Sequence, residues 1–271
     1  MPPKISIHPN IAQAETLFSE FYTNAEIFID CKEKIFASSW QFITHLSTFN
    51  DHTIFPFSFL RGYIDEPLLL IKNEDIINCY SNVCTHRAHL VANRPCSINA
   101  LRCPYHGRNF NLDGTLKYMP GFEGVKNFPT KKDNLKSIPT LKWKNFIFAS
   151  LNASIDMMPV LNDIEKRLPS FPFDDLTHDE NSSASWEIDA HWALYCENYL
   201  EGFHVPFVHK GLAKDIDVNT YETKLLENGV LQIAEGKETI EILKDPQTPT
   251  RNIYGLYYWI FPNIMLNFYS W

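Results

Sequence analysis

The segments Cys84-Thr85-His86-Arg87 and Cys103-Pro104-Tyr105-His106-Gly107 decide how this chain is interpreted. Sixteen residues separate His86 from Cys103, and each segment offers one thiolate and one imidazole. Together the segments can hold two metal ions of different character, one by the sulfurs and one by the nitrogens. Turn residues follow, including the pair Asp113-Gly114, so we expect the ligands in loops at the tips of β-hairpins.

This is the ligand set of a Rieske [2Fe-2S] cluster, in which imidazoles replace two thiolates on one iron and make the added electron easier to accept. A structural zinc site also uses two Cys and two His, but it usually pairs Cys with Cys and His with His along the sequence. Here the two types alternate within each segment. Zinc is therefore the weaker alternative, and four unrelated core or surface residues are weaker still.

The two segments resemble the cluster-binding boxes of the ring-hydroxylating oxygenase branch of the Rieske family. The high-potential branch of respiratory complexes carries an extra disulfide between its loops, and the corresponding positions here are His89 and Tyr105. We therefore expect no such disulfide. One departure from the oxygenase pattern is Arg108, where many members have Trp; it leaves ligation untouched and can alter the surface or docking face of the cluster.

Composition narrows the class of protein. The 271 residues, 45% of them hydrophobic, suffice for one large or two moderate globular domains, and the net charge of −8 argues against a nucleic-acid partner. Neither a signal-like N-terminus nor an apolar run long enough for a membrane span is evident, so we expect a cytoplasmic protein. In that reducing compartment we expect free buried thiols at the remaining cysteines, Cys31, Cys79, Cys96 and Cys196.

A second constellation, Asn198-x-x-Glu201-x-x-His204-x-x-x-x-His209, lies in the last third of the sequence. Composition up to Gly202 predicts a helix on which Asn198, Glu201 and His204 share one face. Pro206 breaks that helix, so a kink can return His209 to the same point. Two imidazoles with one carboxylate form the non-haem Fe(II) oxygenase site. Alone, a Glu-x-x-His is commonly a solvated or capping pair, and a di-iron site would need a second such motif, which the sequence lacks.

This pattern resembles, position for position, the iron motif of ring-hydroxylating oxygenase α subunits. The resemblance implies that His204 and His209 bind a mononuclear Fe(II). It further implies that Glu201 does not ligate this iron but bridges, by hydrogen bonds, from His204 to His106 of a neighbouring subunit in a homotrimer or related oligomer. Glu201 and Asn198 are accordingly the candidate catalytic residues.

The third iron ligand of that family is an Asp, or sometimes a Glu, on a helix far downstream of the two His. No acidic residue follows Asp245 in this sequence, and the apolar stretch 253–271 predicts two strands. Because a complete domain seldom ends on so apolar a strand, we expect a fragment truncated at the C-terminus or half of a split protein, with the third ligand beyond Trp271. The alternative is that Glu201 completes a degenerate site.

The expected fold class is α+β. Residues 1–39 predict an N-terminal helical segment that packs on the catalytic domain, residues 40–150 an all-β Rieske domain, and residues 151–271 a partial catalytic domain. By resemblance the catalytic domain is of the helix-grip (START-like) type. Expected local elements are the hairpin of residues 68–71 and 76–80, a second hairpin around Asp113-Gly114 and a closing strand near residues 144–151.

The sequence therefore predicts a Rieske oxygenase α subunit that uses O2 to mono- or dihydroxylate an aromatic or small organic substrate, quaternary amines included. Electrons would come from NAD(P)H through a separate reductase, with or without a ferredoxin. Rival hypotheses are a Rieske electron-transfer protein with a non-functional second site and a non-catalytic binding domain. Residues that could line the substrate pocket, although for each a place in the core is at least as well supported, are Phe203, Phe207, Tyr258, Trp259 and Phe261.

The stretch 128–144 contains several lysines and connects the cluster segments to the closing strand. A solvated connecting loop is the favoured interpretation, and a docking patch for an acidic electron donor is the alternative. The lysines concerned are Lys131, Lys132, Lys136, Lys142 and Lys144.

Overall fold

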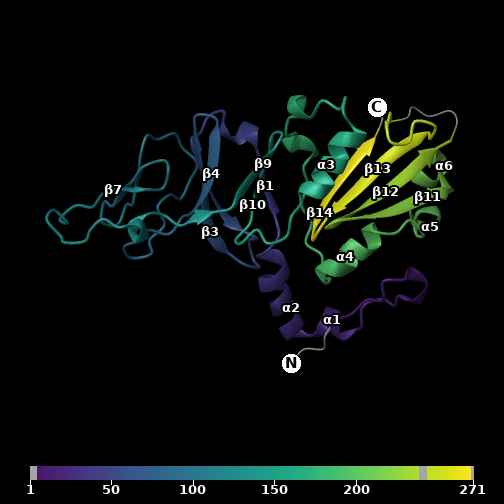
Figure 1. The fold of residues 1–271 in the computed structure, drawn as a ribbon, viewed down its shortest axis with the longest axis horizontal. Helices are drawn as coiled ribbons and strands as arrows, with labels where there is room; N and C mark the ends of the chain where they lie inside the picture. The colour runs from purple at the N-terminus through teal and green to yellow at the C-terminus, as the bar shows by residue number, and fades with distance from the viewer. Residues whose placement is uncertain (1–4, 238–242, 270–271) are drawn as a thin grey trace. The chain divides into compact units, whose positions relative to one another are not determined.

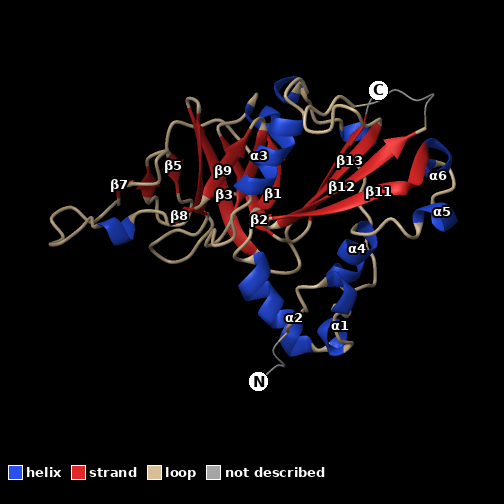
Figure 2. Cartoon of the chain, turned by 45° about the vertical axis from the view of Figure 1, so that its right-hand side comes forward, coloured by secondary structure: helices blue, strands red, loops and turns tan. Residues whose placement is uncertain are grey.

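The computed structural model describes residues 5–237 and 243–269, which form two compact units. One unit, here called the β unit, comprises residues 40–154 and 172–183. The other, the mixed unit, comprises residues 1–39, 155–171 and 184–271. The α+β class expected from the sequence is confirmed: the α-helices belong to the mixed unit, while strands dominate the β unit (Figures 1 and 2).

The β unit is built from three antiparallel sheets. The largest has the order β2-β3-β4-β8, with β2 Ile54–Phe59, β3 Glu66–Asn73, β4 Ile76–Ser81 and β8 Ser137–Ile138. A second sheet has the order β1-β10-β9, with β1 Gln41–His45, β10 Phe146–Ala149 and β9 Thr140–Trp143. The third has the order β5-β6-β7, with β5 Leu101–Arg102, β6 Asn109–Phe110 and β7 Leu116–Tyr118. Short 3-10 helices cover Leu46–Phe49, Lys131–Asp133, Phe173–Asp175 and Glu180–Ser182.

Strand β3 organises the core of the β unit because both of its faces are buried. Successive side chains of a strand point to opposite faces, so Leu68 and Leu70 pack in one cluster with Phe59. Leu69 and Ile71 pack in the other cluster, which also contains Cys84 and Cys103. The predicted β3–β4 hairpin is confirmed, with Leu69 opposite Tyr80, and its core directly supports the ligand segments.

The mixed unit is an antiparallel sheet of order β11-β12-β13-β14 with helices around it (Figure 1). Its strands are β11 Ile216–Leu226, β12 Gly229–Gly236, β13 Ile253–Ile260 and β14 Ile264–Tyr269. Helix α3, Met158–Arg167, packs on one face, where the Tyr258 hydroxyl donates to Asp163 over 2.7 Å. Gly229 is needed at this contact, since a Cβ there would lie 2.6 Å from Val160.

The remaining helices of the mixed unit are short. The N-terminal elements are a 3-10 turn Ile11–Gln13, α1 Glu20–Thr23, α2 Ala25–Cys31 and a π-helical turn Lys32–Phe36. Phe21, Ile27 and Cys31 form a core cluster with Ala193 of α4, Trp192–Tyr199. Two single-turn helices, α5 Val205–Val208 and α6 Leu212–Asp215, lead into β11. No helix of the described residues is long and apolar enough to cross a membrane.

Candidate functional site

The two ligand segments of the β unit fold into loops of the same conformation. The Cys84 amide donates to the His89 carbonyl over 2.8 Å, and the Cys103 amide donates to the Arg108 carbonyl over 2.8 Å. Four residues after each cysteine an amide returns to its carbonyl, from Ala88 and from Gly107, both over 3.0 Å. Ala88 and Gly107 have φ of 53° and 73°, so each loop reverses through a left-handed residue.

The loops bring like ligands together. Cys84 and Cys103 are only 3% and 2% exposed, and Cys103 is near enough to Cys84 to act on the pKa of its thiol. The rings of His86 and His106 lie with their centroids 4.7 Å apart. Nδ1 of His86 is buried and has no hydrogen-bond partner among the described residues. A buried imidazole nitrogen without a partner, beside a second imidazole, fits a metal ligand.

The protein environment shifts the pKa of the thiol ligand Cys84 upwards and that of the imidazole ligand His86 downwards. Burial raises the pKa of the Cys84 thiol, and the proximity of Cys103 adds to the increase. Burial and the positive charges of His106, Arg87 and Arg108 lower the pKa of His86. The neutral imidazole is the form that binds a metal, so the protein environment already favours the ligand state of His86.

The four predicted ligands form two pairs, one of thiols and one of imidazoles. Within residues 5–237 and 243–269, no three His, Cys, Asp or Glu side chains are placed to hold a single metal ion. A tetrahedral zinc would need all four ligands around one point, whereas a [2Fe-2S] cluster takes two thiolates on one iron and two imidazoles on the other. The residues therefore fit the cluster, with Cys84 and Cys103 on its sulfur side and His86 and His106 on its nitrogen side.

The second constellation lies in the mixed unit, and its local structure corrects one prediction. Helix α4 ends at Tyr199, with Leu200 as its C-cap, so Glu201 and His204 do not continue the helix of Asn198. The Glu201 carboxylate accepts the backbone amides of Phe203 and His204, and such local bonds compete with helix formation. Pro206 was expected to break a helix, but it lies in the first turn of α5, where its missing N–H costs nothing.

Glu201 and His204 nevertheless meet. Oε1 of Glu201 lies 2.5 Å from Nδ1 of His204, so the carboxylate fixes the ring and leaves its other nitrogen, Nε2, free to bind a metal. Burial alone would raise the pKa of Glu201, but hydrogen bonds from the His204 side chain and from two backbone amides outweigh burial and lower it. The rings of His204 and His209 lie with their centroids 5.0 Å apart at 70°.

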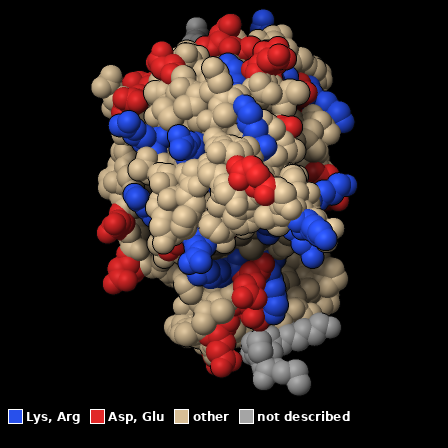
Figure 3. All heavy atoms as spheres, turned by 90° about the vertical axis from the view of Figure 1, so that its left-hand side faces the viewer, with Lys and Arg blue, Asp and Glu red and all other residues tan. Residues whose placement is uncertain are grey.

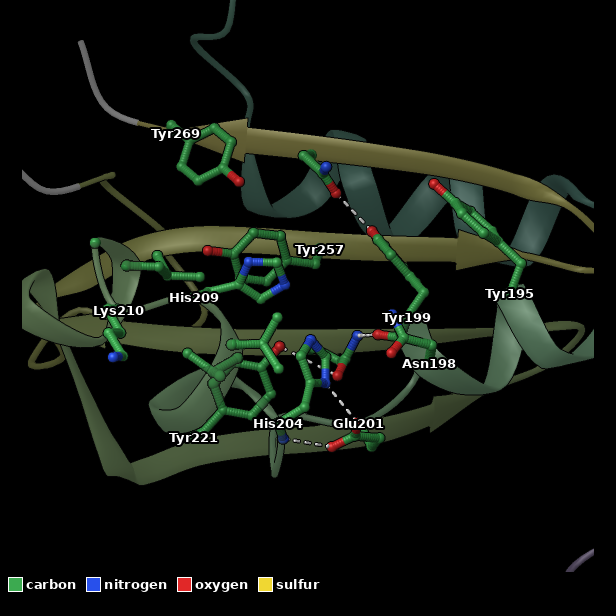
Figure 4. Close-up of a pocket in the computed structure, with 16 residues that line it drawn as sticks. Tyr195, Asn198, Tyr199, Glu201, His204, His209, Lys210, Tyr221, Tyr257 and Tyr269 are labelled. Carbon is green, nitrogen blue, oxygen red and sulfur yellow. Dashed lines mark hydrogen bonds and ion pairs between the residues drawn. The ribbon is translucent and has the colours of Figure 1, made fainter. Parts of the chain in front are cut away.

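His204 and His209 open into a pocket of about 800 Å³ (Figure 4). Asn198 and Glu201 line the same pocket, so the structure brings together all four residues singled out in this stretch. Three residues that line the pocket are joined by hydrogen bonds. The Tyr221 hydroxyl donates to Gln232 over 3.1 Å, and Gln232 donates to the Tyr199 carbonyl over 2.6 Å. The aromatic lining consists of Tyr195, Tyr199, Tyr221, Tyr257 and Tyr269.

The sequence analysis named none of these five tyrosines individually as a wall residue, and the five wall residues it did name do not line the pocket. Phe203 and Phe207 are 86% and 79% exposed. Tyr258 is fully buried on the α3 side, where it donates to Asp163. Strand alternation was the available signal, because neighbouring residues such as Tyr257 and Tyr258 must face opposite sides of the sheet.

Known proteins resemble this chain in the regions of both sites. Residues 39–129 match the model of the Rieske [2Fe-2S] domain, and the four predicted cluster ligands lie within this range. The carnitine monooxygenase oxygenase subunit of Escherichia coli (strain K12) is 29% identical over 270 residues, which cover 95% of this chain and 68% of that relative. The chain therefore contains a Rieske [2Fe-2S] domain and is similar over almost its whole length to the α subunits of Rieske non-haem iron oxygenases. These relatives are named monooxygenases, which makes the chain an oxidoreductase of the Rieske non-haem iron type.

Other similar proteins differ in the substrates that their names give. Chloroplastic choline monooxygenase of Arabidopsis thaliana is 25% identical over 289 residues, covering 99% of this chain and 64% of that relative. Among solved structures, the quaternary ammonium Rieske monooxygenase CntA with an inhibitor has a TM-score of 0.70 and 24% identity, covering 95% of this chain and 69% of that one. Naphthalene 1,2-dioxygenase from Rhodococcus sp. has a TM-score of 0.65 at 20% identity, over 92% and 63% of the two chains.

Proposed function

We propose that this chain is an oxygenase subunit whose substrate is a small quaternary ammonium compound. The observation that carries the proposal is the tyrosine lining of the pocket at His204 and His209. Tyrosine faces attract an organic cation through the negative charge of the ring quadrupole. Two kinds of relative, named carnitine monooxygenase and choline monooxygenase, support the same substrate class.

The residues have distinct roles in this proposal. Cys84, His86, Cys103 and His106 would hold the [2Fe-2S] cluster, and His204 and His209 would bind a mononuclear Fe(II). When bound, the cluster supplies single electrons and the iron activates O2 for hydroxylation. Glu201 holds the His204 ring by Nδ1, so that Nε2 points away from the carboxylate.

The pocket side chains would hold the substrate rather than react with it. Tyr257 is buried. Its ring lies nearly parallel to the ring of Tyr221, and the two ring centroids are 6.4 Å apart. Tyr269 meets Tyr257 edge to face at 5.6 Å. Rings held by such contacts lose little freedom when a ligand binds, so the pocket is preorganised for it.

Electron supply and assembly are part of the same proposal. We infer a separate NAD(P)H-dependent reductase, with or without a ferredoxin, as the donor. We also infer a homotrimer or related oligomer in which Glu201 of one subunit bonds to His106 of the next. Figure 3 shows basic and acidic side chains interspersed on one face of the molecule, so that face gives no particular support to a lysine docking patch.

A second candidate function is an electron-transfer protein in which only the cluster works. It is favoured by one observation: among the described residues, no third His, Cys, Asp or Glu joins His204 and His209 in a group that could hold a metal ion. An oxygenase site usually has two His and one carboxylate. The iron and sulfide content of the purified chain separates the two functions, because only the oxygenase would bind a third iron.

The substrate class is tested by calorimetric titration of the purified chain with choline, carnitine and 3,3-dimethylbutan-1-ol, the neutral carbon analogue of choline. We expect the cations to bind and the neutral analogue to bind at least several-fold more weakly. Replacing Tyr257 by Leu should weaken cation binding by roughly 2- to 30-fold, from a cation–π energy of about 0.5–2 kcal/mol. Tyr257→Phe keeps the ring and should bind like the wild type.

The matched control is Phe268→Leu, because Phe268 lies on the adjoining strand β14, packs on Tyr258 and Phe171, and does not line the pocket. It should leave binding unchanged. Equal affinity for choline and its neutral analogue would refute the quaternary ammonium proposal, while leaving the assignment to the oxygenase family intact.

A further inference from the structure

Arg108 is a buried cation in the second ligand loop, two residues after His106. It is only 2% exposed. Its guanidinium carbon lies 5.9 Å from the ring centroid of Phe110 and 5.7 Å from that of Phe128. A charge is costly to bury unless it is paired and hydrogen-bonded, so the partners of Arg108 are informative.

Asp133 supplies the pairing. Nη2 of Arg108 donates to Oδ1 of Asp133 over 2.6 Å. The other carboxylate oxygen, Oδ2, accepts the amide and the hydroxyl of Thr130, over 2.8 and 2.9 Å. Burial raises the pKa of Asp133, but these hydrogen bonds and the Arg108 charge outweigh it and hold the pKa below its usual value. Asp133 is therefore a carboxylate at neutral pH.

The same turn also holds the first ligand loop. The hydroxyl of Thr85, between Cys84 and His86, donates to the backbone carbonyl of Asp133 over 2.6 Å. Asp133 thus contacts both ligand loops, one through Thr85 and one through Arg108. The stretch that contains Asp133 is consequently more than a solvated connection.

The Nε–H group of Arg108 is a hydrogen-bond donor that has no evident acceptor. It is buried and has no hydrogen-bond partner among the described residues, which is unfavourable for a buried donor. The positive charge of Arg108 acts on both Cys84 and His86, so the guanidinium lies within electrostatic reach of the ligands. Sulfurs of a cluster are hydrogen-bond acceptors, and bonds to them help to set its reduction potential.

We propose that Arg108 raises the reduction potential of the cluster. Asp133 and the rings of Phe110 and Phe128 hold the guanidinium in place, and its free Nε–H and buried positive charge favour the reduced state. The reduced state carries one more negative charge than the oxidised state. A fixed cation in a poorly screened site stabilises that extra charge, and Asp133 opposes it.

The test is a redox titration of the reconstituted chain, followed by the electron paramagnetic resonance signal of the reduced cluster, with iron and acid-labile sulfide measured on the same samples. Arg108→Gln should lower the ratio of reduced to oxidised cluster at fixed ambient potential at least tenfold, or about 59 mV for one electron. Asp133→Asn removes the opposing charge and should move the ratio the other way.

Arg87→Gln is the matched control. Arg87 neighbours His86 and also acts on it, but it is exposed to solvent, so the ratio should change less than twofold. Shifts of the same sign in Arg108→Gln and Asp133→Asn would overturn the proposal, as would an Arg108→Gln shift no larger than that of Arg87→Gln. If Arg108→Gln assembles no cluster, the sign of the Asp133→Asn shift decides alone, and a fall in the ratio overturns the proposal.

Discussion

Glu201 and His204 are joined by a contact of 2.5 Å between Oε1 and Nδ1 across a turn that follows helix α4. The carboxylate also accepts two backbone amides, so its position is fixed by the chain itself. The ring of His204 is therefore oriented before any metal binds. Orientation of a metal ligand by a carboxylate is a common feature of metal sites and raises the basicity of the ligand.

Replacing Glu201 by Gln tests this relationship. The amide oxygen can still accept from Nδ1–H, so we expect iron to bind, while the lost charge lowers turnover roughly 10- to 100-fold. Steady-state hydroxylation and iron content are measured together. Glu197→Gln is the control, because this carboxylate on α4 bonds to Tyr22 and does not line the pocket. Unchanged turnover in Glu201→Gln would remove Glu201 from the catalytic machinery.

Gly202 provides a second test, because it lies directly under a pocket ring. A Cβ added there would be 2.8 Å from the ring of Tyr221, closer than real Cβ contacts, so Gly202→Ala must displace that ring. We expect a loss of stability of about 1–3 kcal/mol and weaker substrate binding. Gly211→Ala is matched, since Gly211 lines the same pocket and its added Cβ meets nothing within 4 Å. Thermal melts and calorimetry that fail to separate the two variants would contradict this packing.

Ala88 offers a gain of stability in the β unit. It has φ of 53° at the position where the second loop has Gly107. A side chain in this conformation costs about 1–2 kcal/mol, partly offset by the greater freedom of glycine in the unfolded chain. Ala88→Gly should therefore stabilise the unit by roughly 0.5–1 kcal/mol, seen as a higher unfolding temperature. Ala100→Gly, at a residue without positive φ, should not stabilise; equal effects of the two would exclude strain at Ala88.

The sequence alone predicted the features that depend on residue type and on spacing over a few residues. The β3–β4 hairpin follows from two apolar runs around Asn73-Glu74-Asp75, and Glu74 indeed has the positive φ of a tight turn. Free thiols were also predicted, and none of the six cysteines forms a disulfide, although Cys96 is only partly buried where a buried thiol was expected. The two cluster loops could be located because their ligands lie within a few residues of one another.

The sequence did not predict the features of the site that depend on contacts between distant residues. The end of α4 at Tyr199 depends on the Glu201 carboxylate bonding to amides ahead of it, which helix propensity does not reveal. The pocket needs β13 to turn Tyr257 rather than Tyr258 towards His209, and that register is set by pairing with β12 and β14. Arg108 stood out in the sequence as a departure from the family, but its burial and its pairing with Asp133 became evident only in the folded β unit.

The central claim is that one chain carries both a Rieske cluster and a mononuclear iron at His204 and His209. Iron and acid-labile sulfide in the purified, anaerobically reconstituted protein test it most directly. We predict about three irons to two sulfides per chain, falling to about two to two when His204 and His209 are both replaced by Ala. A wild-type ratio of two to two would contradict the claim and leave a protein that carries electrons without activating oxygen.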